Sequence, residues 1–147
     1  AAMADHRAAD REFTHGGLRP DSEAAQRALA LYRAFLRRYR NDPRVGEVLF
    51  RVGVLNHNIA DTRFNEGTLR RDDRCVREAV SAYRRFLRRS PGDPQASNVQ
   101  MKLALILENS GDLRGARDAW EKFLARYPED PQAGNVRSRL AGMASEK

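Results

Sequence analysis

The residues best suited to chemistry are a single cysteine and a histidine. Cys75 lies between Arg74 and Arg77 near the expected start of a helix. Neighbouring cations and a helix N-terminus both stabilise a thiolate, so Cys75 with His57 as base is a candidate nucleophilic pair. The residue 51 positions earlier, which a repeat described below makes equivalent to Cys75, is Ala24. The position therefore needs only a small residue, and we expect no catalytic function.

Metal and cofactor sites have equally weak sequence support. His6, His15 and His57 are scattered, and no H-x-x-x-H or C-x-x-C spacing brings metal ligands together. The chain has no glycine-rich phosphate loop and no G-x-S-x-G nucleophile elbow. The sequence predicts no catalytic, cofactor or metal residues.

The charge of the chain indicates a different kind of chemistry. The 147 residues carry a net charge of +7, mostly from arginine, and Arg37-Arg38 and Arg88-Arg89 are repeated doublets. Such an excess attracts polyanions, so a basic nucleic-acid-binding protein is one alternative. Acidic residues are interspersed, and the aromatic residues fall mainly on apolar helix faces, where they cannot stack on bases. Nucleic acid is therefore not the expected partner.

A phrase occurs three times along the chain. "YRAFLRRYRNDP" at 32–43 returns as "YRRFLRRSPGDP" at 83–94 and as "WEKFLARYPEDP" at 120–131. The first two copies are 51 residues apart and the last two 37 apart. At a shift of 51 the match extends upstream, from "ADREFTHGGLRPD" to "ADTRFNEGTLRRD". The unit therefore has a long form with an extended loop, at 14–21 and 65–73, and a short form.

Each unit is predicted to be a pair of helices. Apolar residues recur at intervals of three and four, and Asp-Pro pairs at 42–43, 93–94 and 130–131 are typical helix starts. Gly111 followed by Asp112 indicates a helix stop and a new N-cap. No segment alternates like a strand, so the fold is all-α. The expected helices span 1–13, 23–40, 44–64, 74–90, 95–109, 113–127 and 132–144.

These helix pairs resemble tetratricopeptide repeats. In the clearest unit, residues 99–128, Leu103-Ala104 stands at the close-packing pair of the first helix. Ala116, Trp120 and Pro128 match the small, aromatic and terminal proline positions of the second helix. The resemblance implies an α-solenoid of helix-turn-helix hairpins, two of them with lengthened inter-helix loops. It places the solenoid at 23–144, a remnant of a first repeat helix and its loop at 1–22, and a tail at 145–147.

A narrower resemblance concerns location. The phrase "FLARYPEDPQA" at 123–133 is similar to that of the repeat subclass found in bacterial cell-envelope assembly and Tol-Pal-associated proteins. It implies a periplasmic or envelope location, with the cytoplasm as the alternative. No apolar run approaches the roughly 18 residues of a membrane span.

The resemblance also implies a binding groove on the concave side, lined by the first helix of each unit. An apolar groove suits an apolar or amphipathic segment of another protein. The alternative is that these side chains belong to the core. The groove positions are Phe50, Val54, His57, Met101, Leu105 and Glu108.

The repeated loops are the second candidate surface. Leu18, Arg19, Leu69 and Arg70 would project from one edge of the solenoid. The alternative is that Phe13 and Phe64 fill the space between hairpins while the two leucines fold back onto them.

The sequence thus predicts a non-catalytic protein–protein interaction scaffold within a bacterial envelope assembly. A further alternative is a structural subunit that stacks on its own kind, because uncapped solenoid ends would expose apolar surface.

Overall fold

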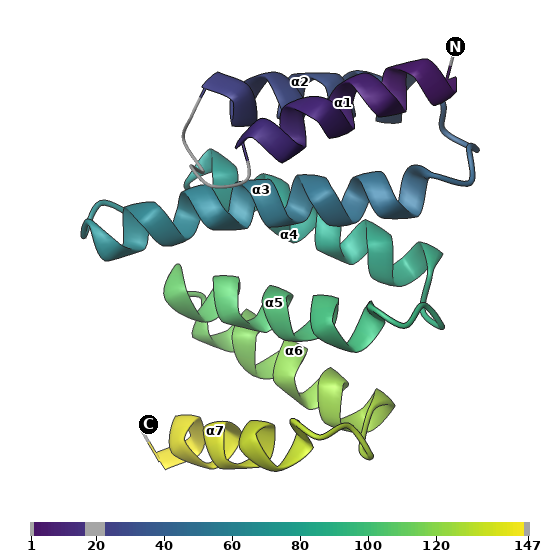
Figure 1. Cartoon of the computed structure of the whole chain (residues 1–147). Coiled ribbons are helices and arrows are strands. Elements are labelled where there is room, and N and C mark those ends of the chain that lie inside the picture. The colour runs from purple at the N-terminus through teal and green to yellow at the C-terminus, as the bar shows by residue number, and fades with distance from the viewer. Residues whose placement is uncertain (1, 17–22, 146–147) are drawn as a thin grey trace.

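The part of the chain that the structure describes, residues 2–16 and 23–145 of a computed structural model, forms seven α-helices and no strand. Figure 1 shows them as a stack of hairpins. The helices are α1 (Ala2–Gly16), α2 (Glu23–Arg38), α3 (Val45–Asn65), α4 (Arg74–Arg89), α5 (Ala96–Asn109), α6 (Leu113–Arg126) and α7 (Ala133–Ser145).

The helices pair in chain order and the pairs stack in the same order. α1 packs along α2, α3 along α4, and α5 along α6, while α7 packs against α6. Successive hairpins meet through α2 and α3, then through α4 and α5, with α3 also contacting α5. The predicted all-α solenoid of helix hairpins is confirmed.

The core repeats with the sequence. Tyr32, Tyr83 and Trp120 occupy equivalent second-helix positions, and all three side chains are buried. The same holds for the phenylalanines three residues later and the alanines four residues earlier. Because each second helix presents the same apolar stripe to its first helix, one packing solution is used three times.

One glycine lies where α3 and α4 pack tightly. A Cβ on Gly53 of α3 would lie 2.3 Å from Cε1 of Tyr83 in α4. That distance is well inside van der Waals contact, so no side chain fits at this position while the tyrosine stays in place. Gly53 therefore allows α3 to pack against the buried ring of Tyr83.

The Asp-Pro pairs lie one turn ahead of the helices that they were expected to start. The Asp42 carboxylate accepts the Arg44 amide at 2.9 Å, and α3 begins only at Val45. Asp93 and Asp130 accept the amides of Gln95 and Gln132 in the same way, at 2.8 Å each. The proline and the aspartate thus form a turn before the helix. The predicted cap at Asp112 is confirmed, after Gly111 at a φ of +89°.

Helix α7 is the last described helix and packs on α6. Ala133, Val136 and Met143 are buried toward the rest of the protein. Arg137 is exposed, as are Asn135 and Ser138 on the side of α7 that faces α5. Leu140 is half-buried and Ala141 is exposed. Stacking of the solenoid ends on another copy stays a prediction. No helix within the described residues is both long and apolar enough to span a bilayer.

Candidate partner-binding face

The first helices of the hairpins, α1, α3, α5 and α7, follow one another along the stack (Figure 1). We call the surface that they form the first-helix face. Five of the six predicted groove residues have half-buried side chains on these helices: Phe50, Val54, Met101, Leu105 and Glu108. The sixth, His57, is buried.

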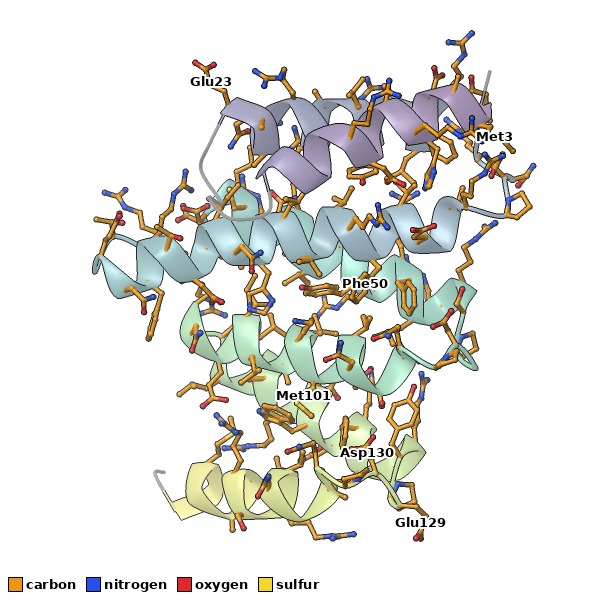
Figure 2. The ribbon with its side chains drawn as sticks, in the orientation of Figure 1. Met3, Glu23, Phe50, Met101, Glu129 and Asp130 are labelled. Carbon is orange, nitrogen blue, oxygen red and sulfur yellow. The ribbon has the colours of Figure 1, made fainter. Side chains whose placement is uncertain are left out.

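Phe50 lies between α3 and α5 (Figure 2). Its ring centroid is 6.1 Å from that of Phe86 in α4, a buried residue of the same hairpin. Phe50 therefore both packs against the core and keeps part of its ring accessible.

A cavity of about 520 Å³ lies between α5 and α7. Met101 and Leu105 of α5 line one side, and Val136 and Arg139 of α7 line the other, with the Trp120 side chain also contributing. Figure 2 shows Met101 in the space between these two helices. The volume falls in the range of sites that hold a few side chains of a ligand, and methionine adapts readily to a partner's shape.

Glu108 is held at the edge of this cavity by two contacts. Its carboxylate accepts a hydrogen bond from Nε1 of Trp120 at 3.3 Å and is 2.9 Å from Nη1 of Arg139. The Arg139 guanidinium also lies over the Trp120 ring, 5.2 Å from its centroid. Glu108 therefore joins α5, α6 and α7.

His57 is not part of an open groove, contrary to the prediction. Its Nδ1 is 3.0 Å from the Tyr83 hydroxyl and its Nε2 is 3.5 Å from the Asp61 carboxylate. Burial lowers the pKa of His57, although Asp61 opposes the change. The side chain faces into the α3–α4 hairpin, since Tyr83 offers it a hydrogen-bond partner there.

Sequence reasoning missed a polar contact that recurs at each second-helix aromatic residue. Tyr32 donates to Asp10 of α1 at 2.6 Å, and Arg51 of α3 donates to the Tyr32 hydroxyl at 3.1 Å. The Tyr83–His57 and Trp120–Glu108 pairs repeat the first of these contacts. The repeat spacings of 51 and 37 make Arg51, Lys102 and Arg139 equivalent. This register was the signal that could have revealed the pattern.

His6, Asp10 and Glu47 offer ligand atoms within 4.8 Å of one another. Arg51 donates to the Asp10 carboxylate and lies 2.6 Å from the Glu47 carboxylate. The guanidinium thus supplies the positive charge that a metal ion would bring, so the cluster is an ion-pair network between α1 and α3.

The second repeated loop, residues 66–73, folds back on the protein. Gly67 turns the chain at a φ of +73°, and Leu69 is half-buried against the core. Arg63 closes the loop, with Nη1 2.7 Å from the Asp73 carboxylate. Phe64 is 48% exposed, so the alternative in which it fills the space between hairpins is wrong.

The remaining loop residues are either exposed or outside the residues that the structure describes. Arg70 is exposed, as a projecting loop residue would be. Leu18 and Arg19 lie outside the described residues, as does the side chain of Phe13. A shared binding surface formed by both loop copies therefore stays a prediction.

Cys75 and His57 do not form a nucleophile–base pair. Burial raises the pKa of the Cys75 thiol, and the nearby Arg63 only partly offsets this. Both ring nitrogens of His57 face Tyr83 and Asp61. A protonated thiol and a base directed elsewhere give no support to nucleophilic chemistry.

The family model described as Tetratricopeptide repeat matches residues 64–131 and 101–141, which together cover more than half of the chain. The matches extend from the end of α3 to α7. No curated protein matches the chain.

Proposed function

Because this chain belongs to the tetratricopeptide repeat family, whose members generally mediate protein–protein interactions, we propose that it is a scaffold whose first-helix face binds an apolar or amphipathic segment of a partner protein. The scaffold acts without catalysis. Its partner contributes side chains to the space between neighbouring first helices.

The observation that carries this proposal is the cavity between α5 and α7. Met101 and Leu105 are half-buried there, so part of each apolar side chain faces the open volume of about 520 Å³. Burying the remainder against a partner's apolar residues would add roughly 25 cal/mol for each Å² removed from water. Glu108 and Arg139 at the rim satisfy each other, so they would favour a ligand with few charges at this point.

A second part of the proposal concerns the cellular compartment of the protein. The likeness of "FLARYPEDPQA" to the envelope-type subclass suggests a multiprotein assembly in the bacterial cell envelope. Fractionation of the source cell tests this directly, since a chain recovered only with cytoplasmic markers would contradict it.

The test of the binding face is affinity capture from the source cell with a Phe50→Glu/Met101→Glu variant beside the wild-type protein. Two carboxylates on this face oppose burial of apolar side chains, so a partner recovered by the wild-type protein should be lost. Circular dichroism should show that the variant remains helical.

The matched control is Ala30→Glu/Leu113→Glu. Ala30 is exposed on α2 and Leu113 is 50% exposed at the start of α6, so both lie on second helices, away from the first-helix face. The control adds the same charge and should retain the partner. Equal recovery by both double variants would contradict binding at the first-helix face.

A further inference from the structure

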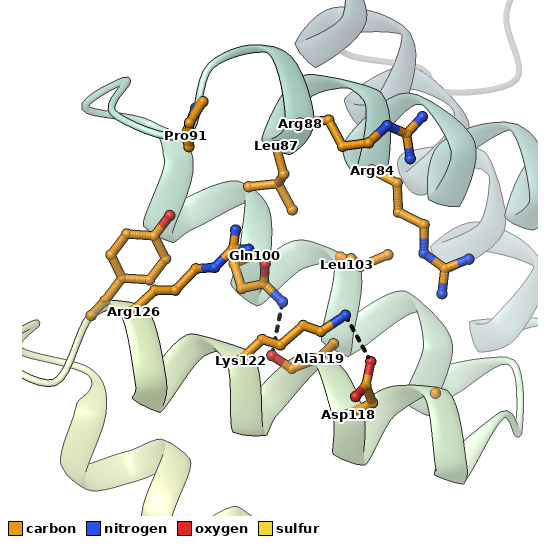
Figure 3. Close-up of a pocket in the computed structure, with 12 residues that line it drawn as sticks. Arg84, Leu87, Arg88, Pro91, Gln100, Leu103, Asp118, Ala119, Lys122 and Arg126 are labelled. Atoms are coloured by element: carbon orange, nitrogen blue, oxygen red, sulfur yellow. Dashed lines mark hydrogen bonds and ion pairs between the residues drawn. The ribbon is translucent and has the colours of Figure 1, made fainter.

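The opposite side of the stack carries a second set of grooves. One lies between α2 and α4 with α3 beneath it, as three adjoining cavities of about 450, 320 and 470 Å³ that share Arg85. The other, of about 600 Å³, lies between α4 and α6 with α5 beneath it (Figure 3). We call these the outer grooves.

The two outer grooves are built from equivalent residues. Leu36 and Val52 line the first, and Leu87 and Leu103, each 51 positions later, line the second. Arg37 and Arg88 are related in the same way. Each groove therefore combines an apolar base with basic residues along its edges, once per hairpin.

Most of the arginines along these grooves have no acidic partner. Arg33 and Arg74 of the first groove are the exceptions, since both pair with Glu78, Arg74 at 3.0 Å. In the second groove the Asp118 carboxylate is 3.2 Å from Lys122. Among the described residues, no carboxylate pairs with Arg37, Arg40, Arg84, Arg85, Arg88 or Arg126.

Two arginines of the first-helix face are paired instead. There Arg51 contacts Asp10 and Glu47, and Arg139 contacts Glu108. Arginines near the last turn of a helix interact favourably with its dipole, but that interaction satisfies neither their hydrogen-bond donors nor their charge. The outer grooves are thus complementary to an anionic ligand.

The lining also distinguishes between anionic ligands. Single-stranded nucleic acid is held by stacking bases on aromatic side chains, and among the described residues no aromatic side chain lines the first outer groove. The described lining of the second includes one aromatic residue, Tyr127, which packs against Phe123 at a centroid distance of 5.6 Å. Leucine at the base of both grooves, joined by valine in the first, instead suits a ligand with aliphatic side chains between its carboxylates.

We propose that the outer grooves bind an acidic amphipathic segment of a protein, with its leucine-type side chains over the base and its carboxylates on the unpaired arginines. This second surface is independent of the first-helix face. The scaffold would therefore hold two segments on opposite sides of the stack.

The probe is a fluorescent synthetic helical peptide with leucine on one face and glutamate on the other, measured by fluorescence anisotropy. The test variant is Arg37→Gln/Arg85→Gln/Arg88→Gln, which removes three groove charges. Since exposed ion pairs each contribute modestly, the Kd should rise about tenfold in the variant. Added salt should weaken binding to the wild-type protein.

The matched control is Arg7→Gln/Arg70→Gln/Arg137→Gln. These three arginines are exposed on α1, on the 66–73 loop and on α7, and their removal changes the net charge equally. The Kd should then change less than about twofold. An equal loss in both variants would show attraction by net charge alone and overturn the proposal.

Three further probes identify the ligand chemistry. Peptides with every glutamate changed to glutamine, or every leucine changed to serine, should each bind more weakly than the parent peptide. Oligothymidylate should bind more weakly as well. Tighter binding of oligothymidylate, sensitive to the groove variant, would assign the grooves to nucleic acid, and absence of peptide binding would also overturn the proposal.

Discussion

One position of the second helix is always a large buried aromatic residue, but its polar atom and that atom's partner differ between hairpins. Tyr32, Tyr83 and Trp120 are all buried, and each directs its polar atom to the first helix of its own hairpin. A buried hydroxyl or indole N–H needs a hydrogen-bond partner, so the facing residue must be polar. That requirement explains Asp10, His57 and Glu108 within otherwise apolar surroundings.

The buried His57 makes stability depend on pH. Because its pKa is lowered in the folded protein, the unfolded chain binds more protons once the pH falls below about 6.5. Stability is therefore complete above that pH and decreases as the pH falls toward the folded-state pKa. The groups around the imidazole are Asp61, Lys102 and Tyr83.

The variant that tests this dependence is His57→Gln, which keeps a hydrogen-bonding group but does not titrate. Thermal unfolding measured from about pH 7.5 to pH 5 should show a shallower loss of Tm in the variant than in the wild-type protein. Parallel curves would contradict a role for His57. The Asp42 carboxylate becomes protonated only at lower pH, because hydrogen bonds from Arg44 hold its pKa below the ordinary value. Its contribution to stability is therefore lost at a lower pH than that of His57.

Gly53 provides a second prediction at this scale. The Gly53→Ala substitution places a Cβ against the buried Tyr83 ring and should destabilise the protein by about 1–3 kcal/mol. Urea unfolding measures the change.

The control for Gly53 is Gly142→Ala in α7, where an added Cβ meets open space. Alanine reduces the entropy of the unfolded chain, so this change should stabilise by roughly 0.5–1 kcal/mol. A neutral Gly53→Ala variant would mean that α3 and α4 can separate without cost.

At the scale of elements, α7 packs on α6 alone among the described helices, and the Glu108–Arg139 contact with the Trp120 ring adds a polar link to α5 and α6. A helix with one packed face has a low free energy of local opening. The same contacts form one wall of the cavity between α5 and α7.

Removing the link should therefore loosen α7 selectively. In an Arg139→Ala variant, amide hydrogen exchange across α7 should accelerate about fivefold to tenfold, since one ion pair and one cation–π contact are lost. Exchange in α3 and α4 should not change.

Arg137→Ala is the matched variant, because Arg137 lies on the exposed side of the same helix. Its exchange rates should equal those of the wild-type protein. Faster exchange throughout the protein in the Arg139→Ala variant would show that α7 opens only with the whole stack.

At the scale of the whole molecule, the two sides of the stack use their charges differently. On the first-helix face, Arg51 and Arg139 contact carboxylates of a neighbouring hairpin, which joins one hairpin to the next. Along the outer grooves, the equivalent Arg37 and Arg88 have no carboxylate partner among the described residues. The outer grooves therefore combine unpaired arginines with an apolar base that can hold a ligand.

The sequence by itself determined the fold, because the repeated phrases specify which residues each hairpin buries. Its helix limits agree with the structure to within about three residues at each end. The narrower assignment to an envelope assembly depends on the amino-acid sequence of one repeat, and it stays a prediction.

Only the tertiary structure decided which side chains are available to a partner. Periodicity puts Val54, His57 and Glu108 on related helix positions, but their exposure depends on the neighbouring helix that each meets. Tyr83 draws His57 into the hairpin, whereas Glu108 reaches both Trp120 and the next helix. Pairing of charges between hairpins is likewise a property of three-dimensional contacts, which is why the outer grooves became visible only in the assembled stack.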